Sequence, residues 1–452
     1  MSESNTIVAD EKYVFKSETR NRLMIIFALG LLLFIVGVFM AKSGGGHEEH
    51  KAAVDIAHNL TASIAHDGDH DEVAGEHAGT APWLKRIYTT LWMNNVFFTG
   101  LAVIGLFFVA IQYAAQAGWS VGVRRLPLAM AHWLPIAGVL MLVIWFVVKG
   151  DVFHWTHAEL YDPKSDHYDK VIDAKGGFFY WPGKHGAFPI FYILRMVVFF
   201  GLWYLFFSWI KKEMTAEDLD GNVQHWKNSR KYSAIFLVIF AVSSSVAAWD
   251  WVMSIDTHWY STMTGWYLFA SWWVAGLAMI TYLTVLLKDA GYLKIVNANH
   301  LHDLGKFVFA FSIFWTYIWF SQFLLIYYAN IPEETVYFVQ RRTVSPYSWV
   351  FFANLFLNFV LPFLLLMTRD AKRHMTMLKV VCPIVIVGHW IDHFNMITPG
   401  VMQHDGGLGL LEIGMALMFL AAFLMITFSS LTKFALVPKN DPMLQESLGH
   451  HI

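Results

Sequence analysis

Three ionisable residues interrupt an otherwise apolar stretch, GHWIDHFNM, at residues 388–396. They are His389, Asp392 and His393, and their spacing places His389 on one helix face with each of the other two. An ionisable side chain in hydrocarbon is costly, so such residues usually mark proton relays, ion paths or ligand sites. Because histidine titrates near neutral pH, two histidines and an acid on one face suit proton exchange.

Four further ionisable residues lie within apolar runs. They are Arg195 in FYILRMVVFF, Asp250 in SSSVAAWDWVMSID, Glu412 in GLLEIGM and His132 in AMAHWLPIAG. Groups at matching depth in a membrane can pair, which reduces the cost of burying their charges. Structural roles stay open for all of them. Arg195 can neutralise one carboxylate, Asp250 and Glu412 can be interfacial acids reached by water, and His132 can be a hydrogen-bonded core histidine.

The composition is that of a membrane protein. Charged residues make up 15% of the 452 positions and hydrophobic residues 56%, whereas a soluble protein carries about 25% charged residues. The net charge of −2 indicates no nucleic-acid partner. Cys382 is the only cysteine, which excludes an internal disulfide, a cysteine-ligated iron–sulfur cluster and covalently attached c-type haem in this chain.

Ten apolar runs are long enough to cross a bilayer, which requires about 20 residues. They lie near residues 22–41, 94–116, 127–149, 189–210, 232–254, 264–287, 306–329, 347–368, 376–396 and 408–432. The sequence therefore predicts an all-α integral membrane protein with about ten transmembrane helices. Its membrane domain covers residues 22–432, between tails at 1–21 and 433–452.

Lysine and arginine are distributed unevenly between the loops. They crowd the short loops on one side, whereas the alternate short loops hold only Arg341 and Arg342. The positive-inside rule then places both termini in the cytoplasm, with the long segments 42–93 and 150–188 in the periplasm of a bacterial inner membrane. At a rise of about 1.5 Å per residue, His132 lies toward the cytoplasm and the other six ionisable residues toward the periplasm.

The two long segments differ in composition. Segment 44–80 is rich in Gly, Ala and His; such tracts can bind metal, but the irregular spacing favours a solvated loop. Segment 150–188 mixes aromatic and acidic residues, which predicts a folded loop that faces a partner. His389 and His393 lie on one helix, which supplies too few ligands for haem or a mononuclear metal, so we expect no metal and no cofactor bound by this chain.

Two long stretches resemble a known family. AWDWVMSIDTHWYSTMTGWYLFA (248–270) and FWTYIWFSQFLLIYYANIPEETVYFVQRR (314–342) resemble the membrane subunits of bacterial alternative complex III, a quinol:electron-acceptor oxidoreductase. The resemblance is to the F-type subunit, within the polysulfide-reductase (NrfD-like) membrane-subunit family. Its strongest part is IPEETVYFVQRR.

The resemblance implies two four-helix bundles, made of helices two to five and six to nine, with the outer helices flanking them. It implies a sister quinol-binding membrane subunit, a periplasmic iron–sulfur protein, multihaem cytochromes c, small membrane subunits and lipids as partners. Haem c and iron–sulfur clusters are then on the partners, with menaquinone or another quinone nearby. It also implies a proton-conducting role for this chain. The expected proton path comprises Asp250, His389, Asp392 and His393, joined by Glu412, His132 and Arg195.

Two other functions stay open on the residues alone. A proton-coupled secondary transporter would use GHWIDHF as its proton site, and Pro135 and Pro383 fit broken helices, although the two halves show no clear sequence symmetry. A structural scaffold would dock partner subunits through its aromatic loops, with its polar residues merely paired. Substitution of the polar residues separates these functions, because a scaffold loses assembly and a proton path loses turnover.

Overall fold

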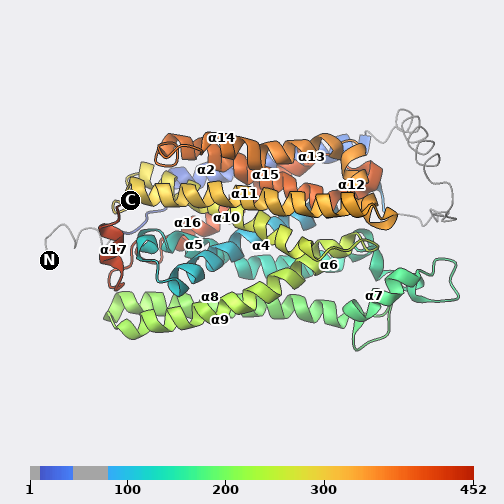
Figure 1. The fold of residues 1–452 in the computed structure, drawn as a ribbon, viewed down its shortest axis with the longest axis horizontal. Helices are drawn as coiled ribbons and strands as arrows, with labels where there is room; N and C mark the ends of the chain where they lie inside the picture. The colour runs from blue at the N-terminus through green and yellow to red at the C-terminus, as the bar shows by residue number, and fades with distance from the viewer. Residues whose placement is uncertain (1–10, 44–79, 452) are drawn as a thin grey trace.

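The computed structural model describes residues 11–43 and 80–451, which fold into helices and connecting turns. Ten of the helical segments in this part of the chain are long and apolar enough to cross a membrane (Figure 1). They are α2 (Ser17–Ser43), α4 (Pro82–Ala114), α5 (Arg125–Met130) continued by α6 (Leu134–Val152), α8 (Ile190–Asp220), α9 (Val223–Trp251), α10 (Met263–Asp289), α11 (Ala298–Ala329), α13 (Tyr347–Leu355) continued by α14 (Leu361–Leu365), α15 (Met375–Met402) and α16 (Leu410–Leu431). The predicted all-α membrane architecture is confirmed.

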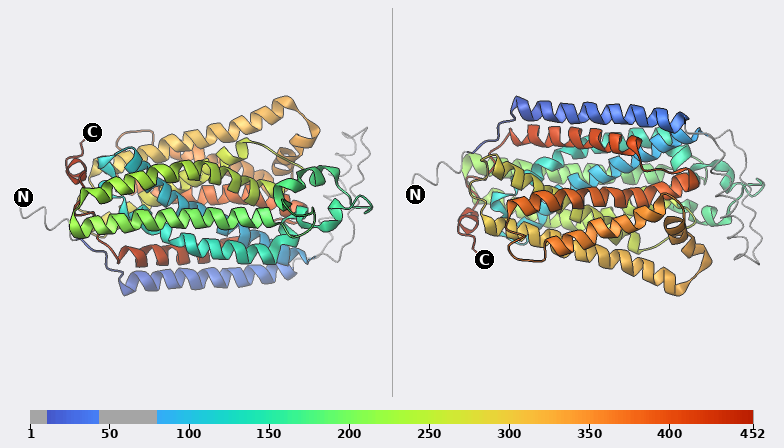
Figure 2. Two further views of the ribbon diagram at one scale, coloured as in Figure 1. Left: turned by 90° about the horizontal axis from the view of Figure 1, so that it is seen from below. Right: turned by 90° about the horizontal axis from the view of Figure 1, so that it is seen from above.

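The helices pack as two four-helix bundles, as expected. In the first bundle α4, α6, α8 and α9 each contact the next around a ring, and in the second α10, α11, α13–α14 and α15 do the same. The remaining pair, α2 and α16, packs against α4 at the side of the bundles (Figure 2). Because α4 and α10 are 89% buried along their apolar windows, whereas α2 is 17% buried, the first two form the core where the bundles meet.

Close approach of the two bundles depends on a small residue. A Cβ atom added to Gly276 of α10 would lie 2.2 Å from the Ile104 side chain of α4. No larger residue fits there without moving one helix, so the glycine brings the two bundles into contact.

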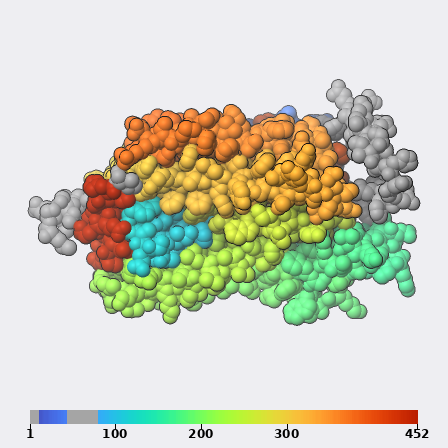
Figure 3. Space-filling view, in the orientation of Figure 1, coloured from blue at the N-terminus to red at the C-terminus, as the bar shows by residue number. Residues whose placement is uncertain are grey.

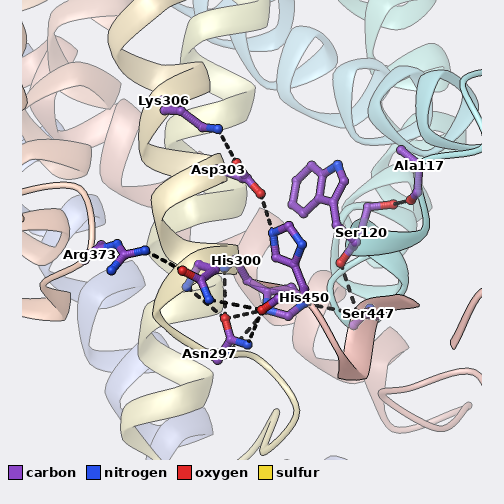
Figure 4. A network of polar contacts seen from close by, with 12 residues as sticks. Ala117, Ser120, Asn297, His300, Asp303, Lys306, Arg373, Ser447 and His450 are labelled. Carbon is purple, nitrogen blue, oxygen red and sulfur yellow. Dashed lines mark hydrogen bonds and ion pairs between the residues drawn. The ribbon is translucent and has the colours of Figure 1, made fainter. Parts of the chain in front are cut away.

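Both ends of the described chain lie at the same end of the bundles. Lys12 forms an isolated β-bridge with Ala435, and the C-terminal segment with the short helix α17 (Leu444–Leu448) lies at one end of the molecule (Figure 3). A polar network then ties the C-terminal segment to α11 (Figure 4). In it, His450 Nε2 lies 2.6 Å from Asp303 Oδ2, and Asn297 Nδ2 donates to the His450 carbonyl across 3.0 Å. The segment 433–451 is therefore packed structure.

The opposite end carries the outer loops. Segment 150–188 is folded as predicted, around 3₁₀ turns and α7 (Lys170–Tyr180). The helix α12 (Pro332–Thr343) folds back over the second bundle and contacts α11, α13 and α15. The helix of the second span begins at Pro82, within the segment 42–93 that the sequence assigned to a periplasmic loop. The His-rich segment 44–80 lies outside the described residues apart from Thr80.

Candidate functional site

Asp392 of α15 lies at the centre of the second bundle and is fully buried. Its Oδ1 atom accepts hydrogen bonds from the hydroxyl of Tyr267 on α10 and from Nδ2 of Asn354 on α13, the latter across 2.7 Å. Its Oδ2 atom accepts from Nε1 of Trp315 on α11, across 2.9 Å. Every helix of the bundle thus contributes to the centre. All three partners donate, which is the arrangement that satisfies an ionised carboxylate.

His389 lies one turn before Asp392 on α15 and is also fully buried. Its Nδ1 atom lies 3.1 Å from the Ser271 hydroxyl oxygen and 3.8 Å from Asp392 Oδ2. Its Nε2 atom has no hydrogen-bond partner among the described residues. A protonated His389 would place a positive charge beside the Asp392 carboxylate. The two side chains form a pair that can hold one proton with no net charge.

The amide of Asn354 is oriented by a second asparagine. Asn358 donates its Nδ2 hydrogen to Asn354 Oδ1, which turns the Asn354 amide so that its own hydrogen faces Asp392. Asn358 lies in a π-helical turn, Phe356–Val360, between α13 and α14, a feature that recurs at functional sites. A Cβ atom on Gly388 would lie 2.2 Å from Asn358 Oδ1, so glycine is required where α15 passes this turn.

His393 does not join the pair. Its Nδ1 hydrogen is donated to the His389 carbonyl across 2.8 Å, and its ring packs edge-on against Phe97 of α4, with centroids 5.1 Å apart. The sequence grouped both histidines with Asp392 on one face. The structure brings together only His389 and Asp392, because His393 faces the contact between the two bundles.

Arg341 of α12 donates hydrogen bonds to backbone carbonyls near the outer end of α15. Pro399 has no N–H and leaves the carbonyl four residues earlier, that of Asn395, without its helical donor. Arg341 Nε donates to this Asn395 carbonyl across 2.8 Å, and Nη2 donates to the Met396 carbonyl across 3.0 Å. Nη2 also lies 2.9 Å from Asp256 Oδ2 near the surface. Arg341 is only 1% exposed, so a residue assigned from sequence to a loop is a buried donor to carbonyl groups inside α15.

A small cavity of about 10 Å³ separates the Asp392 centre from this arginine. Tyr267, Gln322, Asn395 and Arg341 are among its lining residues. The space suffices for about one water molecule. The Asn395 Oδ1 atom has no hydrogen-bond partner among the described residues. Polar groups therefore continue from Asp392 through the Tyr267 hydroxyl toward Arg341 and Asp256 at the outer end.

Arg195 and Asp250 form a closed ion pair in the first bundle. Arg195 Nε donates to Asp250 Oδ2 across 2.7 Å, and Nη2 donates to Oδ1 across 2.6 Å. The remaining nitrogen, Nη1, donates to the Phe178 carbonyl of α7 across 2.7 Å. The guanidinium is thus fully engaged by a bidentate carboxylate and a carbonyl. The pair joins α8, α9 and the outer loop, and it takes no part in the Asp392 centre.

Glu412 of α16 has a partner that the sequence analysis missed. Arg86 of α4 meets it in a two-point contact, with Nε 2.5 Å from Oε1 and Nη2 2.7 Å from Oε2. Glu412 Oε2 also accepts from the Gly409 backbone N–H at the start of its own helix, across 2.7 Å. Glu412 therefore caps α16 and fastens it to α4.

His132 lies in the 3₁₀ turn between α5 and α6, at the end of the molecule that carries the C-terminal segment. Its Nδ1 atom lies 3.3 Å from the Ala129 carbonyl, and its ring packs edge-on against Phe207 of α8. It has no contact with His389 or Asp392. The residues expected to share one outer depth thus form three separate sites, and His132 lies apart from all of them.

Most partners of Asp392 are not predicted from the sequence. Asn354 and Asn358 gave a usable signal, because two amides four positions apart in the apolar run 347–368 lie on one helix face. No signal in the sequence marks Tyr267, Ser271 and Trp315, because Tyr, Ser and Trp are common throughout these spans. The helix register alone does not say which of the aromatic residues faces a carboxylate.

Within residues 11–43 and 80–451, the fold and the site define a helical membrane protein with ten candidate spans and a buried, protonatable Asp–His pair in its second bundle. No protein-family model and no curated protein matches the chain.

Proposed function

We propose that this chain is a membrane subunit of a quinol-oxidising electron-transfer complex, and that it handles protons there. The observation that carries the proposal is the Asp392 centre, where three helices donate hydrogen bonds to one buried carboxylate beside His389. Burying an ionisable group in a membrane is costly, and such groups usually serve a function. Proton exchange is a function that this Asp–His pair can serve.

The proposed path runs toward the outer end of the molecule. The Tyr267 hydroxyl both donates and accepts, so it can pass a proton between Asp392 and a water molecule in the adjoining cavity. From the cavity, Gln322 and the free Asn395 Oδ1 lead to Arg341 and its partner Asp256. The buried Arg341 guanidinium repels a cation, so it is suited to gate the outer opening electrostatically.

The proposed partners carry the redox chemistry. With one cysteine, this chain lacks the cysteine ligands for an iron–sulfur cluster. An iron–sulfur protein, multihaem cytochromes c and a sister quinol-binding subunit are the partners that its resemblance to alternative complex III suggests. Quinol oxidation at the periplasmic face of a bacterial inner membrane would release protons near the Arg341 end. The basic loops would then lie in the cytoplasm with both termini.

A scaffold role is favoured for the remaining charged residues. The pairs Arg195–Asp250 and Arg86–Glu412 are bidentate and join different helices, and both carboxylates are buried. Each carboxylate is already neutralised by its own arginine, and neither pair includes a residue of the Asp392 centre. We therefore assign these four residues to structure and restrict the proton path to the second bundle.

Affinity purification from native membranes tests the proposal. A C-terminal tag is unsuitable, because His450 is packed against α11, so the tag belongs at the N-terminus. The proposal predicts that multihaem cytochromes and an iron–sulfur protein co-purify and that the sample absorbs as c-type haem. A colourless chain without such partners would contradict it and would favour a proton-coupled transporter built on the same Asp–His pair.

A further inference from the structure

An open groove runs along the membrane-facing side of α8, at the end of the bundles that holds the C-terminal segment. Its volume is about 310 Å³. Tyr204, Phe207, Ser208, Lys211, Lys212 and Thr215 line it. The groove thus passes from aromatic rings to hydroxyl and ammonium groups along a single helix.

The polar end of the groove is strongly basic. Lys433, which follows α16, lies close enough to Lys211 for the two ammonium groups to repel each other. Lys211, Lys212 and Lys433 have no ion-pair partner within residues 11–43 and 80–451. The nearby acids are already engaged, since Glu213 lies 2.5 Å from His225 and Asp218 lies 2.6 Å from Arg125. Lys211 and Lys212 therefore line the groove with Lys433 near Lys211, and no ion pair within the described residues neutralises them.

The apolar end of the groove lies on the exposed side of α8. Tyr204 is 47% exposed, and α8 is 39% buried along its apolar window. From Tyr204 to Thr215 the helix rises by roughly 16 Å. An occupant must therefore pair an apolar tail beside Tyr204 with an anionic head beside the lysines. Ser208 supplies a hydroxyl group between the aromatic residues and the lysines, and Thr215 supplies another beyond the lysines.

We infer that this groove binds one anionic phospholipid, with its phosphate held by Lys211, Lys212 and Lys433 and its acyl chain lying over Phe207 and Tyr204. Basic pockets at the cytoplasmic ends of transmembrane helices hold anionic headgroups in this way. The site stands apart from the Asp392 centre and does not depend on the proposed proton path. Its consequence is a fixed lipid that joins α8 to the segment after α16.

Photolabelling tests the inference on the full chain, in the complex as purified in detergent. The probes are a phosphatidylglycerol with a photoreactive acyl chain and a phosphatidylethanolamine with the same chains. The inference predicts that the phosphatidylglycerol labels peptides from 204–215 and that the phosphatidylethanolamine does so far less. The triple variant K211Q/K212Q/K433Q should reduce this labelling by about tenfold or more, since basic residues near the membrane surface attract anionic headgroups.

Two further variants control for general surface charge and for folding. K227Q/K231Q/K294Q removes the same charge from exposed positions at the same end and should leave the labelling unchanged. Ser208→Trp fills the groove while keeping every lysine, and it should abolish the labelling. Equal labelling by both lipids, equal loss in both triple variants, or labels spread over the other helices would overturn the inference.

Discussion

Trp315 of α11 donates its indole hydrogen to Asp392 of α15 across 2.9 Å, and both side chains are fully buried. The two residues are 77 positions apart. A hydrogen bond to a carboxylate is stronger than one between neutral groups, and a low-dielectric core strengthens it further. With Tyr267 and Asn354, this bond fixes the carboxylate in one orientation, with its Oδ2 atom toward His389. The proton-holding pair is therefore positioned by all four helices of its bundle.

His389 and His393 should respond differently to substitution. His389→Gln removes the titratable partner of Asp392, so we expect turnover of the assembled complex to fall about a hundredfold, as for loss of a proton-transfer group. His393→Gln changes a ring that packs on Phe97 and should leave turnover near the wild-type rate. Quinol oxidation rates, normalised to intact complex, measure both. Equal losses in the two variants would show that the pair is wrongly assigned.

We expect the Arg195–Asp250 pair to stabilise the fold and to take no part in turnover. Arg195→Met leaves Asp250 buried without its partner, which should destabilise the protein by about 3–5 kcal/mol. The double variant Arg195→Met with Asp250→Leu removes both charges and should recover most of that loss, together with turnover. Thermal unfolding in detergent and turnover are measured on the same samples. A stable but inactive double variant would instead place this pair in the chemistry.

Substitutions of Arg341 and of its neighbour Arg342 test whether Arg341 stabilises the outer end of α15. Arg341→Lys replaces a fork that reaches two carbonyls and Asp256 with a single ammonium. We expect a loss of about 2 kcal/mol, the scale of one lost charged hydrogen bond. Arg342 is exposed, so Arg342→Lys should change the unfolding temperature little. Comparable shifts in the two variants would contradict the role given to Arg341.

The outer loop should lose stability in acid. Asp169 accepts from the Val171 and Ile172 backbone N–H groups at the start of α7 and contacts His258. Burial acts to raise the pKa of Asp169, but these hydrogen bonds and the histidine together hold that pKa below its ordinary value. A lowered folded-state pKa means that the stabilisation is complete above the unfolded pKa and is lost as the pH falls through the folded one.

Hydrogen exchange in α7 measures this effect. Asp169→Ala should cost about 1 kcal/mol near pH 7, as for loss of a helix N-cap, and nearly nothing once the pH lies below the folded pKa. Asp166→Ala, at an exposed neighbouring position, should have no effect at either pH. A cost for Asp169→Ala that does not change with pH would show that the charge of Asp169 contributes nothing.

The sequence predicted the fold well because its spans are continuous apolar runs, and each run became one helical segment. It placed Arg195 in the proton path and left open that Arg195 neutralises a carboxylate at matching depth, and in the structure Asp250 is that carboxylate. It did not find the Arg86 partner of Glu412. Arg86 lies in a segment read as a loop, although α4 begins four positions earlier, at Pro82. Hydropathy marks where a helix enters the apolar layer, not where it starts.

The Asp392 centre was only half predictable. The cost of burying charge singled out His389 and Asp392, but spacing on α15 could not separate them from His393. That distinction arises from which neighbouring helix each side chain meets. The π-helical turn at Phe356–Val360 also has no signature in apolar periodicity. In this region Asn354 and Asn358 face the interior of the bundle, and only the packed structure reveals the π-helical turn.

The most direct test of the proposed proton role compares Asp392→Asn with Thr427→Val in complexes reconstituted into liposomes. Thr427 is a buried membrane residue whose hydroxyl donates to the Phe423 carbonyl of its own helix, so its loss controls for any intramembrane polar change. Protons released per electron are measured with a pH indicator during quinol oxidation. We predict that Asp392→Asn assembles, slows turnover at least about tenfold and lowers the proton yield, while Thr427→Val matches wild type. An Asp392→Asn complex with wild-type rate and proton yield would contradict the proposal.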